Sequence, residues 1–266
     1  MKCRLFERIP SGVNSCSGSS VHQTHAIVPI STGRLKRMRL VLVALLALSL
    51  GFAEAAEEFS PAERALFMTN HLGALATPAT LRYTFRKSGS LEDNFEDKVT
   101  VALKAQPKSQ CCTATTEFLG GTRRIKLPEV EAATGNPVIL HFLERDIREM
   151  QRLTKGQPNY FRKRIRMAVF QGAEISDVEV PYSGKMVAAR QITISPYSDD
   201  PLRPRYEKFA DKQYIFTLSN VVPGGVYAIR ARVNGASSAG APLLDEEVTL
   251  DTRPAASRET SGTPLR

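Results

Sequence analysis

The stretch TGNPVILHFLERDIREMQRLTKG, residues 134–156, decides the fold because it predicts the longest helix in the chain. Asn136 is placed to cap this helix, Pro137 suits its first position, and Gly156 ends it. Apolar side chains recur at helical spacing along one face: Ile139, Leu143, Ile147 and Met150. We therefore expect a long central helix that buries this face against other elements.

Alternating apolar residues before this helix predict strands. Leu81, Tyr83 and Phe85 share one face of a first strand. A turn at 88–90 leads into a second strand over 94–104, and a second hairpin is expected to turn at 120–121. Ahead of them, residues 59–75 read as an N-terminal helix with a capping box at Ser60.

After the central helix the pattern has period two again. Strands are expected over 160–170, 173–197, 212–233 and 246–250, with turns near 172, 183–184 and 223–225. A short helical turn is expected within 200–212. The sum is an α+β fold: a large, curved, half-barrel-like antiparallel sheet with one N-terminal helix and one long central helix.

The most apolar stretch, residues 40–50, lies ahead of all these elements. Its length of about 11 residues fits the hydrophobic core of a secretory signal, whereas a membrane-spanning helix needs about 20. Basic residues precede it: Arg34, Lys36, Arg37 and Arg39. Ala53 and Ala55 supply the small residues of a cleavage site. We expect a signal peptide over 38–55 that is cleaved before Ala56, and a periplasmic or secreted protein; the alternative is a buried helix.

The remaining boundaries follow from composition. Residues 1–37 carry no periodic apolar pattern, and Met38 stands where a translation start is expected, so we interpret 1–37 as a disordered or misassigned leader. Residues 56–235 are expected to form one α+β domain, and 236–266 a loose C-terminal segment. No transmembrane span is expected after signal cleavage.

Charge and motifs exclude several classes of function. Residues 1–55 hold seven basic and two acidic residues, so their removal lowers the net charge from +9 to +4, which is mild for a nucleic-acid binder. His71 and His141 lack a second ligand at helical spacing, and no Cys/His zinc spacing, P-loop or nucleophile elbow is present. We expect no nucleic-acid partner, no metal and no cofactor, and we assign no catalytic residue. Whether the protein is an enzyme stays open, with a binding role favoured.

The segment YFRKRIRMAVF, residues 160–170, is the most unusual in composition. On a strand, Arg162, Arg164 and Arg166 would share one face and could meet an anionic surface. The alternative is a solvated face that acidic neighbours such as Asp177 and Glu179 neutralise.

Cys111 and Cys112 are the two cysteines beyond the expected signal. Their adjacent Cα atoms are closer than a disulfide usually spans, and strand geometry would point the side chains to opposite faces. We favour two small apolar residues; a vicinal disulfide with a redox role, or pairing between chains, stays open.

Four segments carry a resemblance: GNPVILHFLERDIREM, YFRKRIR, ISPYSDDPLRPRYEKFADKQYIFTLS and VPGGVYAIR. With them the chain resembles uncharacterised exported proteins of Gram-negative proteobacteria, a family that implies no activity. In layout alone it is similar to the half-barrels of periplasmic lipoprotein carriers, in which a curved sheet and helices enclose an apolar cavity. The charge-rich central helix and the absence of Trp depart from that pattern.

These observations favour a periplasmic binding or carrier protein for an apolar or amphipathic ligand, with the three arginines near an anionic group. The candidate cavity residues are Tyr83, Phe85, Phe142, Tyr214 and Phe216, although a core role is the simpler reading of each. An envelope assembly subunit that docks a protein partner without a ligand is the alternative, and a hydrolase with an unrecognised site is the third.

Overall fold

The computed structural model describes residues 59–106, 111–235 and 241–252. The chain divides into two units, 1–58 and 59–266, and the expected leader and signal peptide lie in the first, outside the described residues. Within the described part, no helix combines the length and the hydrophobicity that crossing a membrane requires.

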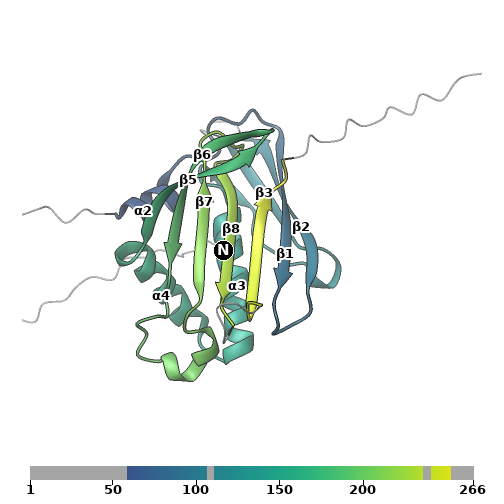
Figure 1. Cartoon of the computed structure of the whole chain (residues 1–266). Coiled ribbons are helices and arrows are strands. Elements are labelled where there is room, and N and C mark those ends of the chain that lie inside the picture. The colour runs from purple at the N-terminus through teal and green to yellow at the C-terminus, as the bar shows by residue number, and fades with distance from the viewer. Residues whose placement is uncertain (1–58, 107–110, 236–240, 253–266) are drawn as a thin grey trace, which may run out of the picture. The chain divides into compact units, whose positions relative to one another are not determined.

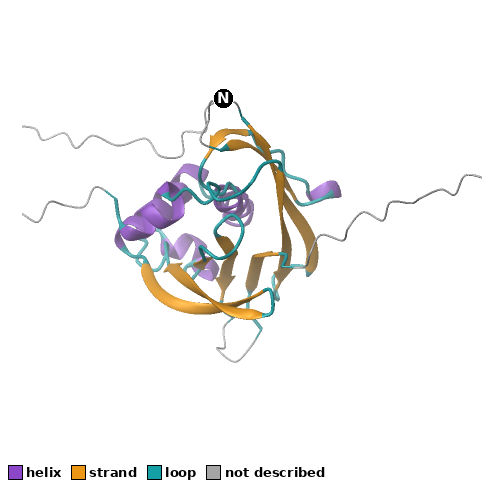
Figure 2. Ribbon diagram, turned by 90° about the horizontal axis from the view of Figure 1, so that it is seen from above, coloured by secondary structure: helices purple, strands orange, loops and turns teal. Residues whose placement is uncertain are grey.

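The described residues of the second unit form one nine-stranded antiparallel sheet, in the order β4-β3-β2-β1-β9-β8-β7-β6-β5. Its strands are β1 (Ala79–Ser88), β2 (Phe95–Ala105), β3 (Cys112–Phe118), β4 (Val130–Ala133), β5 (Glu174–Tyr182), β6 (Lys185–Ile194), β7 (Gln213–Leu218), β8 (Val226–Val233) and β9 (Leu244–Leu250). The predicted large antiparallel sheet is confirmed. Seen from above, the strands follow an open arc (Figure 2).

The longer helices pack on the inner side of this arc (Figure 2). The two long ones are α3 (Val138–Thr154) and α4 (Pro158–Gln171), which lie behind the strands in Figure 1. Three shorter segments complete the set: α2 (Pro61–Glu63), which continues as the π-helical turn η1 (Arg64–Met68), and the 3₁₀ turns η2 (Gly121–Arg123) and η3 (Arg203–Phe209). The apolar face predicted for 134–156 is the buried face of α3.

Strand pairing places the alternating apolar residues of the sequence on the buried face of the sheet. In the β1–β2 hairpin, Leu81 pairs with Val101 and Tyr83 with Val99, and all four side chains are buried. The hairpin turns predicted at 183–184 and 223–225 join β5 to β6 and β7 to β8. Because the apolar residues of these strands recur with period two, one face of the sheet enters the core.

Three expectations need correction. The expected strand over 160–170 is helix α4, so the central helix is followed by a second long one. The N-terminal helix ends at Met68, because Leu72 donates its N–H to the Thr134 carbonyl rather than continuing the helix. The loose C-terminal segment is also wrong over 244–250, because β9 pairs with both β1 and β8 in the middle of the sheet.

The capping box at Ser60 is confirmed. The Glu63 N–H donates to Ser60 Oγ at 3.1 Å, and the Ser60 N–H donates to the Glu63 carboxylate at 2.9 Å. At α3, Asn136 Oδ1 accepts the Val138 N–H at 3.1 Å, which is the capping role that the sequence predicted for Asn136.

Candidate functional site

The three arginines of 160–170 do not form a row. On α4, Arg162 makes a bidentate pair with Glu144 of α3, with both N–O distances 2.7 Å. Arg164 donates from Nε to the Pro196 carbonyl at 2.9 Å and pairs with Asp199 and Asp200. Helical geometry turns Arg164 about 200° away from Arg162, at 100° per residue. Arg162 and Arg164 are therefore paired with acidic residues of the protein, and these acids are not the ones that the sequence indicated.

The five candidate cavity residues lie in the hydrophobic core. Each is at most 1% exposed: Tyr83, Phe85, Phe142, Tyr214 and Phe216. None of them lines either of the two surface pockets described below. Their side chains pack the space between the sheet and α3, so these residues hold the fold together.

Charged groups fill the interior beside them, and sequence reasoning did not find these groups. Asp146 of α3 accepts hydrogen bonds from Lys212 and from the Tyr214 hydroxyl, and the side chains of Asp146 and Lys212 are 0% exposed. Burial and the Asp146 charge raise the pKa of Tyr214 well above its usual value. The phenol therefore stays protonated and donates.

A second buried ion pair joins α3 to β9. Arg145 grips Glu246 with two N–O contacts of 2.5 and 3.1 Å, and its guanidinium lies 4.6 Å from the centre of the Phe85 ring. Lys87 of β1 lies 3.4 Å from the same carboxylate. Burial opposes the ionised form of Glu246, but Arg145 together with Lys212 and Lys87 outweighs it, and the pKa of Glu246 is lowered. The concave side of the sheet is thus occupied by a helix whose buried charges are paired.

His71 and Asn136 hold one end of the sheet together. The Asn136 N–H donates to His71 Nδ1 at 3.2 Å, so Nε2 carries the proton that is donated to the Ala65 carbonyl at 2.9 Å. The Asn136 side chain donates to the Tyr83 hydroxyl and to the Gly224 carbonyl, each at 2.8 Å. This hydrogen-bonded cluster fixes the β7–β8 turn against η1 and the start of α3.

A pocket of about 530 Å³ opens beside this cluster, and we name it the α2 pocket. Its apolar wall includes Ala188, Ala189 and Leu218, from β6 and β7. Arg64 of η1 and Arg190 of β6 also line it, and both side chains are exposed. Its wall thus combines apolar side chains with two guanidiniums.

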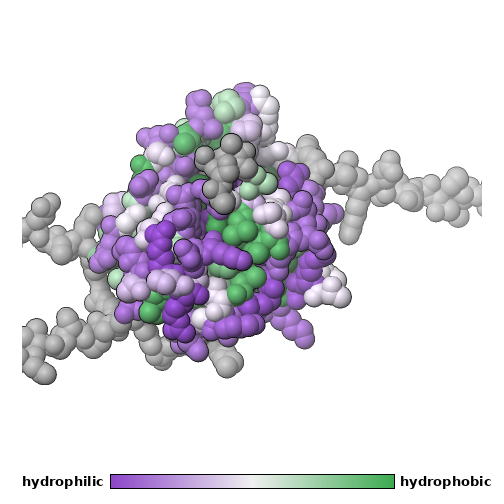
Figure 3. All heavy atoms as spheres, turned by 60° about the horizontal axis from the view of Figure 1, so that its bottom comes forward, coloured by the Kyte–Doolittle hydropathy of each residue, from purple (hydrophilic) through white to green (hydrophobic). Residues whose placement is uncertain are grey.

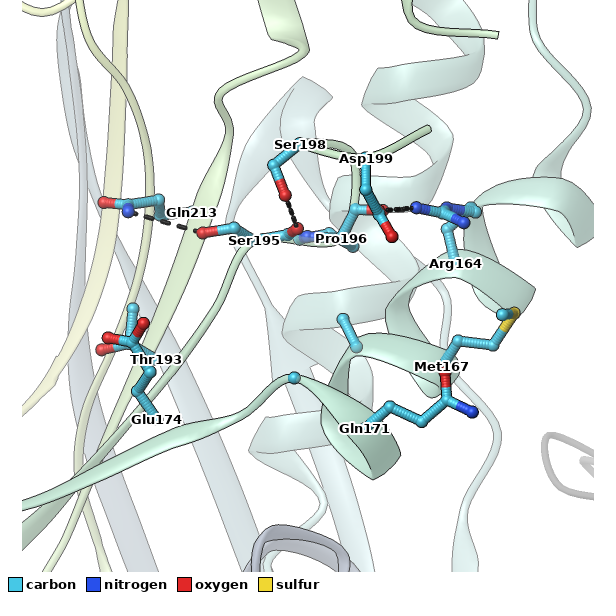
Figure 4. Close-up of a pocket in the computed structure, with 12 residues that line it drawn as sticks. Arg164, Met167, Gln171, Glu174, Thr193, Ser195, Pro196, Ser198, Asp199 and Gln213 are labelled. Atoms are coloured by element: carbon cyan, nitrogen blue, oxygen red, sulfur yellow. Dashed lines mark hydrogen bonds and ion pairs between the residues drawn. The ribbon is translucent and has the colours of Figure 1, made fainter. Parts of the chain in front are cut away.

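A second pocket of about 420 Å³ lies between α4 and the strands β5, β6 and β7, and we name it the α4 pocket. Arg164 lines it, together with Glu174, Ser195 and Gln213 (Figure 4). Of the residues that the sequence singled out as a binding site, Arg164 alone reaches the lining of one of these two pockets.

The sulfurs of Cys111 and Cys112 are joined in a vicinal disulfide, the alternative that we did not favour. Cys112 is the first residue of β3 and is buried, whereas Cys111 precedes the strand in a bend. Because Cys111 lies outside the strand, the alternation of strand side chains does not separate the two sulfurs. A redox role for the pair stays a prediction.

One face of the molecule carries an apolar patch. On the face shown in Figure 3, apolar residues gather near the centre and hydrophilic residues surround them. Large apolar side chains that are more than one third exposed are otherwise spread along the chain: Met68, Phe170, Ile175, Met186, Leu202 and Val221. Isolated residues of this kind are ordinary on protein surfaces. Among the described residues, no group of three or more His, Cys, Asp or Glu side chains is arranged to hold a metal ion.

Burial of the two described histidines makes stability depend on pH. Desolvation lowers the pKa of His71, and it lowers the pKa of His141 to about 4 against the opposing charge of Glu144. The folded protein therefore prefers both rings neutral. Their contribution is complete above the unfolded pKa of about 6.5 and is lost as the pH falls through the lowered folded pKa of each ring, which for His141 is about 4.

We predict that His141→Leu removes most of its share of this loss, about 3 kcal/mol between pH 6.5 and 4. His141 Nδ1 is buried without a hydrogen-bond partner among the described residues, so leucine breaks no bond at that atom. Urea unfolding of both proteins across this range measures the difference, while carboxyl titrations contribute equally to each. Parallel pH profiles for the two proteins would contradict the prediction.

Comparison with known proteins adds little. No protein-family model matches the sequence, and no curated protein matches it either. Among solved structures, the chain is similar to the lipoprotein LppX of Mycobacterium tuberculosis, with 8% identity and a TM-score of 0.27, over 67% of this chain and 89% of that one. A likeness at this level carries no argument about function. The resemblance to exported Gram-negative proteins stays a prediction.

Proposed function

We propose that the protein is a non-enzymatic binding protein that holds an amphipathic ligand with an anionic group in the α2 pocket. The observation that carries this proposal is the composition of that pocket, in which apolar strand side chains and two arginines line one space of about 530 Å³. The proposal keeps the class of function that the sequence favoured. It moves the site from the buried aromatic residues of the core to the surface beside η1.

The chemistry of the lining selects such a ligand. Pockets of about 300–1,000 Å³ with apolar walls and a few polar groups are typical of small-molecule sites. Ala188, Ala189 and Leu218 offer contacts for a short hydrocarbon chain. A guanidinium can grip a carboxylate or phosphate through two hydrogen bonds, so Arg64 and Arg190 favour an anionic group.

The net charge of the residues that line the α2 pocket favours an anionic ligand. Asp177 is the one acidic residue in the lining, against the two arginines. Its position on β5 is opposite Arg190 in the β5–β6 register, yet Arg190 makes no ion pair with any described residue. The net charge of the lining is therefore positive.

Hydrogen bonds also hold part of the lining of the α2 pocket in place. His71 and Gly225 line it, and the hydrogen bonds of His71 to Ala65 and Asn136 fix the ring in place. A binding site is most selective when its lining is held by surrounding hydrogen bonds and packing.

Calorimetric titration with decanoate tests this function. We expect saturable binding of one decanoate, and an affinity at least about tenfold weaker after Arg190→Glu, because a charge-assisted hydrogen bond is replaced by repulsion. Arg82→Glu is the matched control: Arg82 is an exposed strand residue outside both pockets, so the same charge change there should leave the affinity within about twofold. Equal binding of decanoate and decylammonium by the wild type would contradict the proposal.

Export completes the proposed role. Basic residues ending at Arg39, the apolar run over 40–50, and then Ala53 and Ala55 follow one another in the order that a secretory signal requires. We predict that protein recovered from the periplasm or medium begins at Ala56, as N-terminal sequencing would show. Recovery of an intact, cytosolic form that still carries 38–55 would contradict export.

A further inference from the structure

The α4 pocket is built where a helix packs on a sheet, a place that apolar side chains usually fill. Four of its residues lie on one stripe of α4 at helical spacing: Arg164, Met167, Ala168 and Gln171. The stripe begins and ends with polar residues, and the two between them are an unbranched Met and a small Ala. The helix therefore leaves space above the sheet instead of closing on it.

The opposite wall comes from three neighbouring strands. Glu174 of β5 pairs with Thr193 of β6, so their side chains share a face. Ser195 follows two residues after Thr193, and Gln213 of β7 donates to Ser195 Oγ at 3.4 Å. Figure 4 shows Glu174, Thr193, Ser195 and Gln213 on the side of the pocket across from the helix. This wall offers mainly hydrogen-bond acceptors and short polar side chains.

The charge of the pocket is negative. Glu174 and Asp199 are the acidic residues of its lining, against Arg164, whose guanidinium already pairs with Asp199 and with the buried Asp200. Glu174 is exposed and makes no ion pair with any described residue. The last turn of α4 ends at Gln171 beside it, and the carbonyl end of a helix favours cations.

We propose that the α4 pocket is a second binding site, for a small aliphatic amine. The ammonium group pairs with Glu174 and the helix end, and the methylene chain lies against Met167 and Ala168. The second polar end of a diamine meets Asp199, whose side chain is 83% exposed at the other side of the pocket. This site is separate from the α2 pocket and takes a ligand of opposite charge.

Calorimetric titration of the full protein with 1,5-diaminopentane tests the proposal, with glutarate as the dianion of equal chain length. We expect saturable binding of the diamine and none of glutarate. Glu174→Gln should weaken the diamine at least about tenfold, because it removes a charge-assisted hydrogen bond. Glu179→Gln, on the same strand but outside both pockets, should leave the affinity within about twofold.

A second variant tests whether the diamine binds in the α4 pocket itself. Gln171→Lys places an ammonium in the pocket from an exposed helix position, and we expect it to abolish diamine binding while leaving the decanoate affinity unchanged. Failure of decanoate binding alone would overturn the α2 proposal and not this one. Absence of saturable diamine binding up to about 10 mM, or equal affinities in wild type and Glu174→Gln, would overturn this one.

Discussion

Asp146→Asn is expected to lower the free energy of unfolding by about 3–5 kcal/mol, because it leaves the ammonium of Lys212 buried without a counter-charge. Both side chains are 0% exposed, so neither charge can reach water without opening the core. The substitution hardly changes volume, and the loss is therefore electrostatic. Urea unfolding at neutral pH measures it.

Two further variants define the cause. Glu96→Gln breaks the Arg86–Glu96 pair, whose side chains are 68% and 61% exposed, and should cost less than about 1 kcal/mol. The triple variant Asp146→Leu with Lys212→Met and Tyr214→Phe removes both charges and the hydroxyl that donates to Asp146, and it should recover most of the stability, since apolar replacement of a buried pair is often neutral. A loss below about 1 kcal/mol for Asp146→Asn would show that the pair is not buried as described.

Gly224→Ala is the second large effect, with an expected loss of about 2–5 kcal/mol. Gly224 has φ +73°, where a side chain costs about 1–2 kcal/mol. An added Cβ would lie 2.5 Å from Leu81 Cδ1 and 2.8 Å from Asn136 Nδ2, so crowding adds about 1–3 kcal/mol.

Gly184→Ala is its matched control. Gly184 has φ +76° in the β5–β6 turn, but nothing lies within 4 Å of its added Cβ. It should cost only the backbone part, about 1–2 kcal/mol. Thermal or urea unfolding of the two variants separates strain from crowding, and equal losses would mean that the β7–β8 turn does not press on Leu81 and Asn136.

The strand pattern could be predicted because it is local. The β1–β2 register follows from apolar residues two apart, and the turn at 183–184 from its Gly. The segment over 160–170 was misread for an identifiable reason. Phe161, Ile165 and Val169, the buried residues of α4, are four apart, a spacing that satisfies both period two and the helical period. Two signals favoured a helix: Pro158 at its start, and Lys163, which on a strand would lie among the apolar residues of the face opposite the three arginines.

Neither the buried ion pairs nor the α2 pocket could be predicted, because the residues that form them are distant in sequence. Asp146 and Lys212 are 66 residues apart, and Arg145 and Glu246 are 101 apart. A charged residue on an otherwise apolar helix face looks solvated until its partner on another element is known. The same holds for the α2 pocket, which joins η1, β6 and the β7–β8 turn. The basic composition of 160–170 was visible, but the acids that pair with Arg162 and Arg164 lie on α3 and in the β6–β7 connection.

Backbone amide chemical shifts recorded during a decanoate titration locate the bound ligand residue by residue. If the α2 pocket is the binding site, the largest shifts will fall on Ala188–Arg190 of β6 and on Ser219–Val221 of the β7–β8 turn. Shifts concentrated on Tyr83, Phe85 and Phe216, which are buried in the hydrophobic core, would instead place the ligand in the interior and would contradict the proposed site.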